Sequence, residues 1–234
     1  MVLDNVFLTG GSGTLGAELR VQSYKFGIKF VAPSSQECDI TDLESVYKNL
    51  IRFEGDLVLH AAAITDVKKI QQAPIPAMDV NVVGTINLIK SCQQLNKKLV
   101  FISTDYVFDG HKGNYTVEDP INPLSKYAKT KGAAELLVRT IDNSLVIRTS
   151  FFGHDFPYEK AAVDQWSSKD YVDIIAPLIL KELKLKNTGI VHIGTARAST
   201  YEKAARRKPQ VEGVYLQDIG FEIPRDISLK VAMP

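Results

Sequence analysis

The sequence has little cysteine, no excess of basic residues and no long apolar run. Its two cysteines, Cys38 and Cys92, stand far apart without histidine neighbours, so we expect neither a disulfide framework nor a metal site. Lysine and arginine number 28 against 27 acidic residues. The chain therefore lacks the basic surplus typical of nucleic-acid-binding proteins, and we expect no nucleic acid partner.

The lack of a membrane-length apolar segment is informative about the cellular location of the protein. No apolar run approaches the length needed to cross a bilayer. The first strand-like run begins within a few residues of Met1, which leaves no room for a signal peptide. We therefore expect a cytoplasmic protein with reduced cysteines and no membrane partner.

Short apolar runs alternate with longer amphipathic stretches over the first part of the chain. The strand-like runs cover 6–9, 28–32, 56–60, 99–103 and 145–149, and the helix-like stretches lie near 14–26, 42–53, 76–96 and 123–141. This alternation predicts an α/β fold, a Rossmann-type doubly wound parallel sheet covered by helices on both faces.

The pattern changes after residue 149. The following segments read as a loop, a helix containing Pro177, a short strand and a second helix, over 150–167, 168–186, 190–193 and 200–206, and the last 25 residues look irregular. No Gly/Ser-rich linker separates the two parts. We therefore expect residues 1–149 to form one domain, and residues 150–234 to form a small region packed on it.

A glycine-rich turn joins the first strand to the first helix. Residues 10–16 read Gly-Gly-Ser-Gly-Thr-Leu-Gly, with glycine at every third position. Glycine lets the backbone approach a ligand closely, and a helix N-terminus offers free N–H groups and partial positive charge to a pyrophosphate. The strand–turn–helix context favours dinucleotide binding over a purely structural turn.

The carboxylate that usually holds an NAD ribose is missing after the second strand, where the sequence reads Pro33-Ser34-Ser35-Gln36. A carboxylate there would repel the 2′-phosphate of NADP, so its absence tolerates NADP, although no arginine is present to hold that phosphate. We therefore favour NADP(H) and keep NAD(H) as an alternative. Asp39, a little later, could lie against the adenine, cap the helix before Leu43, or do both.

Tyr127 and Lys131 are four residues apart, which places them on one face of a helix. A nearby ammonium is expected to lower the pKa of the phenol, which could then give a proton to a carbonyl oxygen while hydride reaches the carbon. The spacing arises by chance in a chain of this composition, but here it follows the fourth strand, whose end should face the cofactor. Ser103 and Thr104 close that strand. One of their hydroxyl groups could donate a hydrogen bond to the carbonyl oxygen of the substrate. Alternatively, these hydroxyl groups only cap the end of the strand.

These segments together resemble the extended short-chain dehydrogenases/reductases. The motifs that carry this resemblance are the glycine turn, the three alanines after His60, Asn81 before a Val-Val-Gly-Thr run, and the Tyr127/Lys131 pair. More specific runs resemble the dTDP-4-dehydrorhamnose reductase family, which includes the regulatory β subunit of methionine adenosyltransferase. These runs are FISTDYVFDG at 101–110 with Tyr115 and Asn122-Pro123, Arg148-Thr149-Ser150, and PRDISL at 224–229.

The resemblance implies NAD(P)H-dependent reduction of a 4-keto-6-deoxy nucleotide sugar, with residues 1–149 as the NAD(P)-binding domain and residues 150–234 as the small substrate-binding region. It implies that Thr104, Tyr127 and Lys131 are catalytic. Near the substrate it places Asp105, Tyr106, Val107 and Arg148. Along the cofactor it places Gly10, Gly13, Thr14, Leu15, Gly16, Asp39, Ile40, Ala61, Ala62 and Ala63, together with Tyr127 and Lys131.

One departure from the family keeps other functions open. Family members are longer, and the missing part falls largely between Gly153 and Asp164, where the cap over a sugar nucleotide would be smaller and exclude water less completely. The smaller cap favours a regulatory or non-catalytic NAD(P)-binding subunit as the alternative, and a nucleotide-sugar epimerase is a related enzymatic alternative. The sequence leaves the oligomeric state open, with a homodimer as one alternative.

Overall fold

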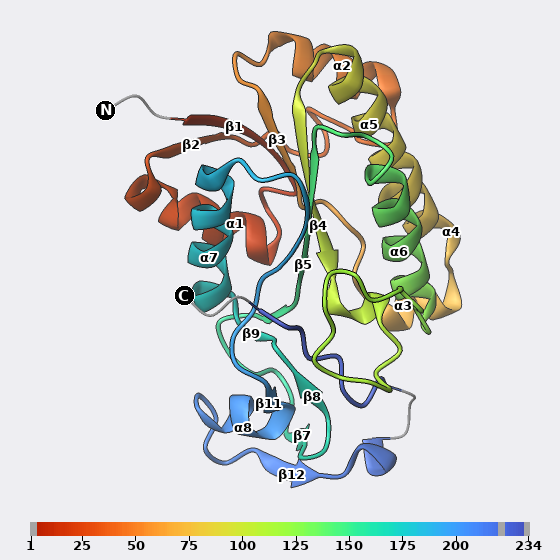
Figure 1. The fold of residues 1–234 in the computed structure, drawn as a ribbon, viewed down its shortest axis with the longest axis vertical. Coiled ribbons are helices and arrows are strands. Elements are labelled where there is room, and N and C mark those ends of the chain that lie inside the picture. Colours follow the sequence, from red (N-terminus) through yellow and green to blue (C-terminus); the bar gives the residue numbers. More distant parts are fainter. Residues whose placement is uncertain (1–3, 220–222, 232–234) are drawn as a thin grey trace.

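A six-stranded parallel sheet forms the centre of the computed structural model, which describes residues 4–219 and 223–231 (Figure 1). The strand order is β10-β5-β4-β3-β1-β2, and each neighbouring pair is parallel. The strands are β1 (Asp4–Thr9), β2 (Ile28–Val31), β3 (Leu57–His60), β4 (Lys98–Thr104), β5 (Ser144–Thr149) and β10 (Gly189–His192).

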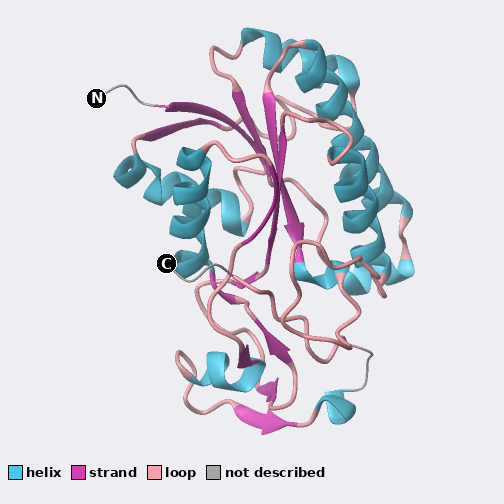
Figure 2. Ribbon diagram, in the orientation of Figure 1, coloured by secondary structure: helices cyan, strands magenta, loops and turns pink. Residues whose placement is uncertain are grey.

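Helices cover both faces of this sheet, as Figures 1 and 2 show. On one face lie α1 (Thr14–Gln22) and α7 (Val172–Leu185), which enclose a core that includes Leu19, Ile147 and Ile175. On the other face lie α2 (Leu43–Arg52), α5 (Gly84–Gln94) and α6 (Lys126–Val138), over a second apolar core. The expected doubly wound α/β fold is therefore confirmed. In the described part of the chain, no helix is long and apolar enough to cross a membrane.

Short helical segments complete this half of the molecule. They are η1 (Ser23–Phe26), α3 (Val67–Gln72), α4 (Ile75–Met78), η2 (Asp79–Val83) and η3 (Asp105–Val107). The helix predicted over 76–96 is real but contains the π-helical turn η2 before α5. Such wide turns inside helices often mark functional sites.

A small lobe lies below the carboxyl ends of β4 and β5 (Figure 1). Three two-stranded sheets build it, with the helix α8 (Thr200–Ala205) and the turn η4 (Leu216–Ile219). Its apolar core includes Phe152, Phe156 and Tyr171. The strand pairs are β6 (Phe151–Phe152) with β9 (Asp170–Tyr171), β7 (Lys160–Ala162) with β12 (Glu212–Val214), and β8 (Trp166–Ser167) with β11 (Ala198–Ser199).

The loop predicted over 150–167 was wrong, because this segment contains β6, β7 and β8. Each of these strands pairs with a segment far along the chain, and strand formation of this kind depends on context that a local pattern does not contain. The helix predicted from 168 begins only at Val172. It continues through Pro177, and the Asp173 carbonyl, which Pro177 cannot bond, accepts a hydrogen bond from Gln22 Nε2 at 3.1 Å.

The chain after residue 149 contributes to both parts of the molecule. It supplies α7 and the sheet strand β10 to the large half, and the lobe strands and α8 to the small half. The expected division into a dinucleotide-binding domain and a substrate-binding region stays a prediction. The expected irregular C-terminal segment contains β12 and η4, and its residues 220–222 and 232–234 lie outside the described residues.

Candidate active site

The carboxyl ends of β1 and β3 mark the place where the strand order reverses. From β1 the sheet continues to β2 on one side and to β3 on the other. In sheets of this type, ligands bind in the crevice beyond the strand ends at such a switch point. The glycine turn follows β1 at this place, and Ala61–Ala63 follow β3.

The three glycines of the turn have different surroundings. Gly10 has a φ of +75°, and a Cβ there would lie 2.6 Å from the Ala62 nitrogen. A Cβ on Gly16 would overlap the Gly10 carbonyl oxygen. Gly13 is exposed, and its Cβ would meet only the Gly10 oxygen, at 3.4 Å. Close backbone packing therefore requires glycine at positions 10 and 16, whereas the space beside Gly13 is open and could accept a side chain or a ligand.

The N-terminus of α1 fits a phosphate group. Gly13 is its N-cap, with extended backbone angles and no side-chain hydrogen bond. The N–H groups in the first turn of a helix have no partner within the helix, and they carry partial positive charge. Thr14 is exposed beside them, while Leu15 is buried and anchors the helix in the core. These residues would hold the pyrophosphate of a dinucleotide.

A carboxylate does lie near the end of β2, contrary to the sequence interpretation. Glu37 folds back, and its Oε2 accepts hydrogen bonds from the Ser34 nitrogen at 2.8 Å and the Ser34 hydroxyl at 2.9 Å. These bonds hold the pKa of Glu37 below its usual range. The phosphate turn is adjacent, since a Cβ on Gly11 would lie 2.7 Å from Ala32 Cβ. The sequence reasoning missed Glu37 because it looked only at residues 33–36.

Asp39 and Ile40 are held against neighbouring segments. The Asp39 carboxylate accepts bonds from the Thr41 nitrogen and hydroxyl, at 2.9 and 2.7 Å. The Ile40 carbonyl accepts a bond from Asn87 Nδ2 at 2.9 Å. The alternative that Asp39 caps the next helix is wrong, because the N-cap of α2 is Asp42, which accepts a bond from the Glu44 nitrogen.

A buried chain of hydrogen bonds connects the end of β1 to α6. His60 Nδ1 lies 2.7 Å from the Thr9 hydroxyl and its Nε2 lies 3.0 Å from the Thr85 hydroxyl. Thr85 donates to the Asn81 carbonyl at 2.7 Å, and Asn81 Nδ2 donates to the Thr130 hydroxyl at 3.0 Å. Burial, and then the charge of Lys131, lower the pKa of His60 to about 3. His60 is therefore a neutral structural side chain.

Tyr127 and Thr104 are brought together at the end of β4. The Thr104 hydroxyl lies near the phenol; it donates to Asp105 Oδ1 at 3.3 Å and accepts a bond from the Tyr106 nitrogen at 3.2 Å. Burial, and then the negative charge of Asp105, raise the pKa of Tyr127 above its usual range, and the nearby Thr104 hydroxyl only partly offsets this rise. This direction is opposite to the one expected from the Tyr–Lys spacing. The phenol is therefore protonated at neutral pH, as a proton donor must be.

Lys131 follows Tyr127 on α6 but is bound elsewhere. Its Nζ donates to the Ile102 carbonyl at 2.7 Å and lies 4.0 Å from the centre of the Phe101 ring. Burial lowers the pKa of Lys131 to about 7, although the charge of Glu135 opposes the shift. The expectation that Lys131 lowers the pKa of Tyr127 fails here because the same helical face does not ensure contact between the two head groups.

The four residues expected near the substrate divide into two pairs. Asp105 and Tyr106 lie directly after β4, beside Thr104, with Asp105 fully buried and Tyr106 half-buried. Val107 is instead packed in an apolar cluster. Arg148 is also fully buried, and its Nη2 lies 2.7 Å from Glu135 Oε1. The structure therefore does not bring Val107 or Arg148 to the surface of the site.

Much of the FISTDYVFDG run and its flanking residues have a structural role. Tyr115 donates to Asp109 Oδ1 at 2.6 Å, and its ring stacks on Phe108 with centroids 4.0 Å apart. Asn122 Nδ2 donates to the other Asp109 oxygen at 3.0 Å. These contacts fix the loop after η3. A residue that the sequence analysis did not single out, Lys169 of the lobe, faces Tyr106 with its Nζ 5.8 Å from the ring centre.

The parallel sheet, the glycine turn and the Tyr–Lys helix define the extended short-chain dehydrogenase/reductase class. Residues 4–163 match the family model described as RmlD substrate binding domain. The chain therefore belongs to this family, which confirms the resemblance seen in its sequence.

Curated relatives support the assignment. The chain is 35% identical over 154 residues to the dTDP-4-dehydrorhamnose reductase of Mycolicibacterium smegmatis, covering 64% of this chain and 46% of that protein. It is 31% identical over 227 residues to the dTDP-4-dehydrorhamnose reductase of Mycobacterium tuberculosis, covering 83% and 74%. Methionine adenosyltransferase 2 subunit beta of Rattus norvegicus is 31% identical over 147 residues, covering 60% and 43%. The matched part thus spans about half of the first relative.

Solved structures share the fold over nearly the whole chain. A hypothetical dTDP-4-dehydrorhamnose reductase from Sulfolobus tokodaii superposes with a TM-score of 0.83 at 30% identity, covering 97% of this chain and 92% of that one. The dTDP-4-dehydrorhamnose reductase of Bacillus anthracis in complex with NADP has a TM-score of 0.88 at 24% identity, covering 98% and 91%. The UDP-glucose 4-epimerase of Thermus thermophilus with NAD has a TM-score of 0.75 at 22% identity, covering 98% and 90%.

The different surroundings of Gly13 and Gly16 predict different effects of added side chains. Gly13→Val should weaken NADPH binding at least tenfold while leaving the melting temperature nearly unchanged, because the new side chain enters open space at the helix end. Gly16→Val should lower the melting temperature itself, because its side chain overlaps the turn. Fluorescence titration with NADPH and thermal unfolding measure both. Undiminished NADPH affinity in Gly13→Val would contradict the phosphate site.

The buried neutral state of His60 predicts acid sensitivity. The pKa of His60 is about 3 in the folded protein against an ordinary value of 6.5. Between these values the unfolded chain binds the proton, so the free energy of unfolding falls as the pH drops, by up to about 1.4 kcal/mol per pH unit. Urea unfolding from pH 6.5 to 4 should show a shallower slope in His60→Gln than in the wild type. His111→Gln, at an exposed position, is the control. Equal slopes would refute this role of His60.

Proposed function

We propose that the protein reduces the keto group of a 4-keto-6-deoxy nucleotide sugar with NAD(P)H. The observation that supports this most is the position of the protonated Tyr127 phenol beside Thr104 at the end of β4, in a fold whose glycine turn fits a dinucleotide. The curated reductases among the relatives agree with this reading.

The reaction divides between the cofactor and the chain. NAD(P)H supplies the hydride that forms the new C–H bond. Tyr127 gives its hydroxyl proton to the carbonyl oxygen, so that the ketone becomes an alcohol, and Thr104 holds the phenol and the substrate oxygen in place. Lys131, whose pKa is lowered to about 7, is only partly protonated near neutrality and can therefore exchange a proton there.

A regulatory, non-catalytic subunit is the second candidate. The similarity to methionine adenosyltransferase 2 subunit beta favours it, as does the small size of the lobe. A nucleotide-sugar epimerase is the third, and it would hold its cofactor without net consumption. Oxidation of NADPH with dTDP-4-dehydrorhamnose, followed at 340 nm, separates these functions.

The Tyr127 hydroxyl is the group on which the reductase proposal depends. Tyr127→Phe removes the proton donor but keeps the ring, so kcat should fall by about 100-fold or more while NADPH still binds. Thr104→Ser, which keeps the hydroxyl, should retain most activity. The rate of NADPH oxidation and the Kd for NADPH are the measurements. Unchanged turnover in Tyr127→Phe would exclude this proton donor.

The position of Glu37 makes NAD(H) a stronger alternative than the sequence alone did. Its carboxylate lies at Ser34, where the adenosine ribose is expected, and would repel a 2′-phosphate. Glu37→Gln should therefore improve NADPH affinity relative to NADH, roughly tenfold, because it removes one like charge at short range. Glu44→Gln, on the exposed side of α2, is the control. An unchanged ratio of the two Kd values would show that Glu37 does not select the cofactor.

A further inference from the structure

The lobe places one lysine at the candidate active site with its ammonium group available. Lys169 precedes β9 and is half-buried. Its Nζ lies 4.7 Å from the ring centre of Phe152 and 5.8 Å from that of Tyr106. Within residues 4–219 and 223–231, this ammonium donates no hydrogen bond and forms no ion pair. The rings of Phe152 and Tyr106 thus flank the Lys169 ammonium group, whose N–H donors are free to bind a ligand.

Asp105 supplies the balancing charge on the sheet side. It is fully buried, and its Oδ2 has no hydrogen-bond partner among the described residues. Its Oδ1 accepts a bond from the Thr104 hydroxyl at 3.3 Å. The positive charge of Lys169 stabilises the carboxylate, although burial still raises the pKa of Asp105 overall. Asp105 thus connects Lys169 with the Thr104–Tyr127 pair.

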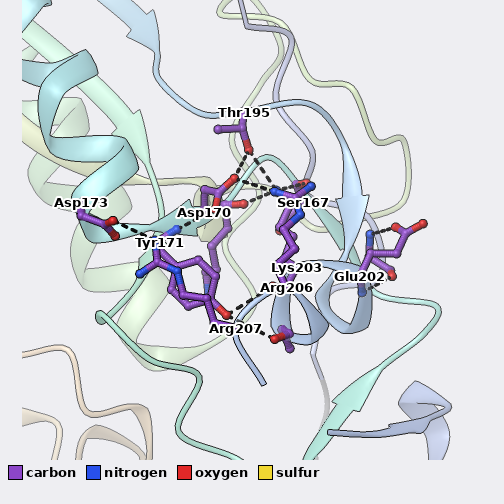
Figure 3. Close-up of polar contacts among 12 residues, drawn as sticks. Ser167, Asp170, Tyr171, Asp173, Thr195, Glu202, Lys203, Arg206 and Arg207 are labelled. Atoms are coloured by element: carbon purple, nitrogen blue, oxygen red, sulfur yellow. Dashed lines mark hydrogen bonds and ion pairs between the residues drawn. The ribbon is translucent and has the colours of Figure 1, made fainter. Parts of the chain in front are cut away.

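The lobe fixes the backbone that carries Lys169. Figure 3 shows the fully buried Lys203 of α8 at the centre of this arrangement. Its Nζ donates to the Lys169 carbonyl and to the Ser167 carbonyl, the latter at 3.1 Å. Asp170 accepts a bond from Thr195 at 2.8 Å and pairs with Arg206 at 3.2 Å. Lys203 and Asp170 are positioning residues, because they hold the segment from which the Lys169 side chain extends.

We propose that Lys169 is a substrate-binding residue that donates hydrogen bonds to oxygen atoms of the sugar moiety, next to the keto group that Tyr127 protonates. The sugar is favoured over the nucleotide phosphates because Asp105, the counter-charge of Lys169, lies beside Thr104 and Tyr127 and would oppose a phosphate. The inference rests on the proposed function, since it assumes a sugar nucleotide at this site. It gives the small lobe a direct part in choosing the sugar.

Calorimetric titration of the full chain with dTDP-rhamnose and with dTDP, each in the presence of cofactor, tests this proposal. Lys169→Met should raise the Kd for dTDP-rhamnose about tenfold or more and leave the Kd for dTDP unchanged, because only the sugar loses a charged donor. Lys169→Arg should recover part of the affinity. Lys160→Met, which removes an exposed lobe lysine paired with Glu212, is the matched control and should match the wild type.

Two results would overturn the proposal. An unchanged Kd for dTDP-rhamnose in Lys169→Met would show that the ammonium does not contact the sugar. An equal loss of affinity for dTDP would show that it contacts the phosphates instead. Failure of the proposed function would give a different result. A wild-type protein that binds dTDP-rhamnose but does not oxidise NADPH with the keto sugar is not a reductase. The effect of Lys169→Met on dTDP-rhamnose binding would still support the role of Lys169. A wild type that binds neither ligand refutes both.

Discussion

The close backbone contact between the turn after β1 and the chain after β3 is the constraint on which the site depends. Gly10, in a left-handed conformation, approaches Ala62 so closely that no side chain fits between them. The bond between Thr9 and His60 joins the same two strand ends. Together they fix the direction in which α1 starts, and with it the open helix end at Gly13. The dinucleotide site that we propose at the switch point depends on this contact.

Local sequence patterns predicted the large half of the molecule well. The alternation of apolar runs and amphipathic stretches is a short-range property, and the six-stranded parallel sheet with helices on both faces agrees with it. In the lobe the helix α8 was predicted but the strands were not, because strands such as β7 and β12 are only three residues long and pair across some fifty residues of sequence. Their stability comes from those distant partners, which no local window contains.

The candidate site shows a similar limit at the level of single side chains. Spacing correctly placed Tyr127 and Lys131 on α6, but it could not show that the Lys131 ammonium reaches back to the Ile102 carbonyl. Arg148 reads as a charged residue at a strand end, yet Glu135, thirteen residues earlier on α6, binds it in the interior. Glu37 and Lys169 belong to no motif. Their importance depends on the direction of a side chain, and that is decided by tertiary packing.

The way the lobe is assembled has a consequence for how the chain folds during synthesis. Every strand pair of the lobe joins a segment between residues 151 and 167 to one between 170 and 214, and the bridge between Trp166 and Asp226 reaches further still. Contacts of high sequence separation form late, after the loop-closure entropy has been overcome. Strands β1 to β5 and their helices emerge from the ribosome first. The large half therefore begins to fold before the lobe has formed, and the apolar residues of 151–162 stay exposed until the segments with which they pack have been synthesised.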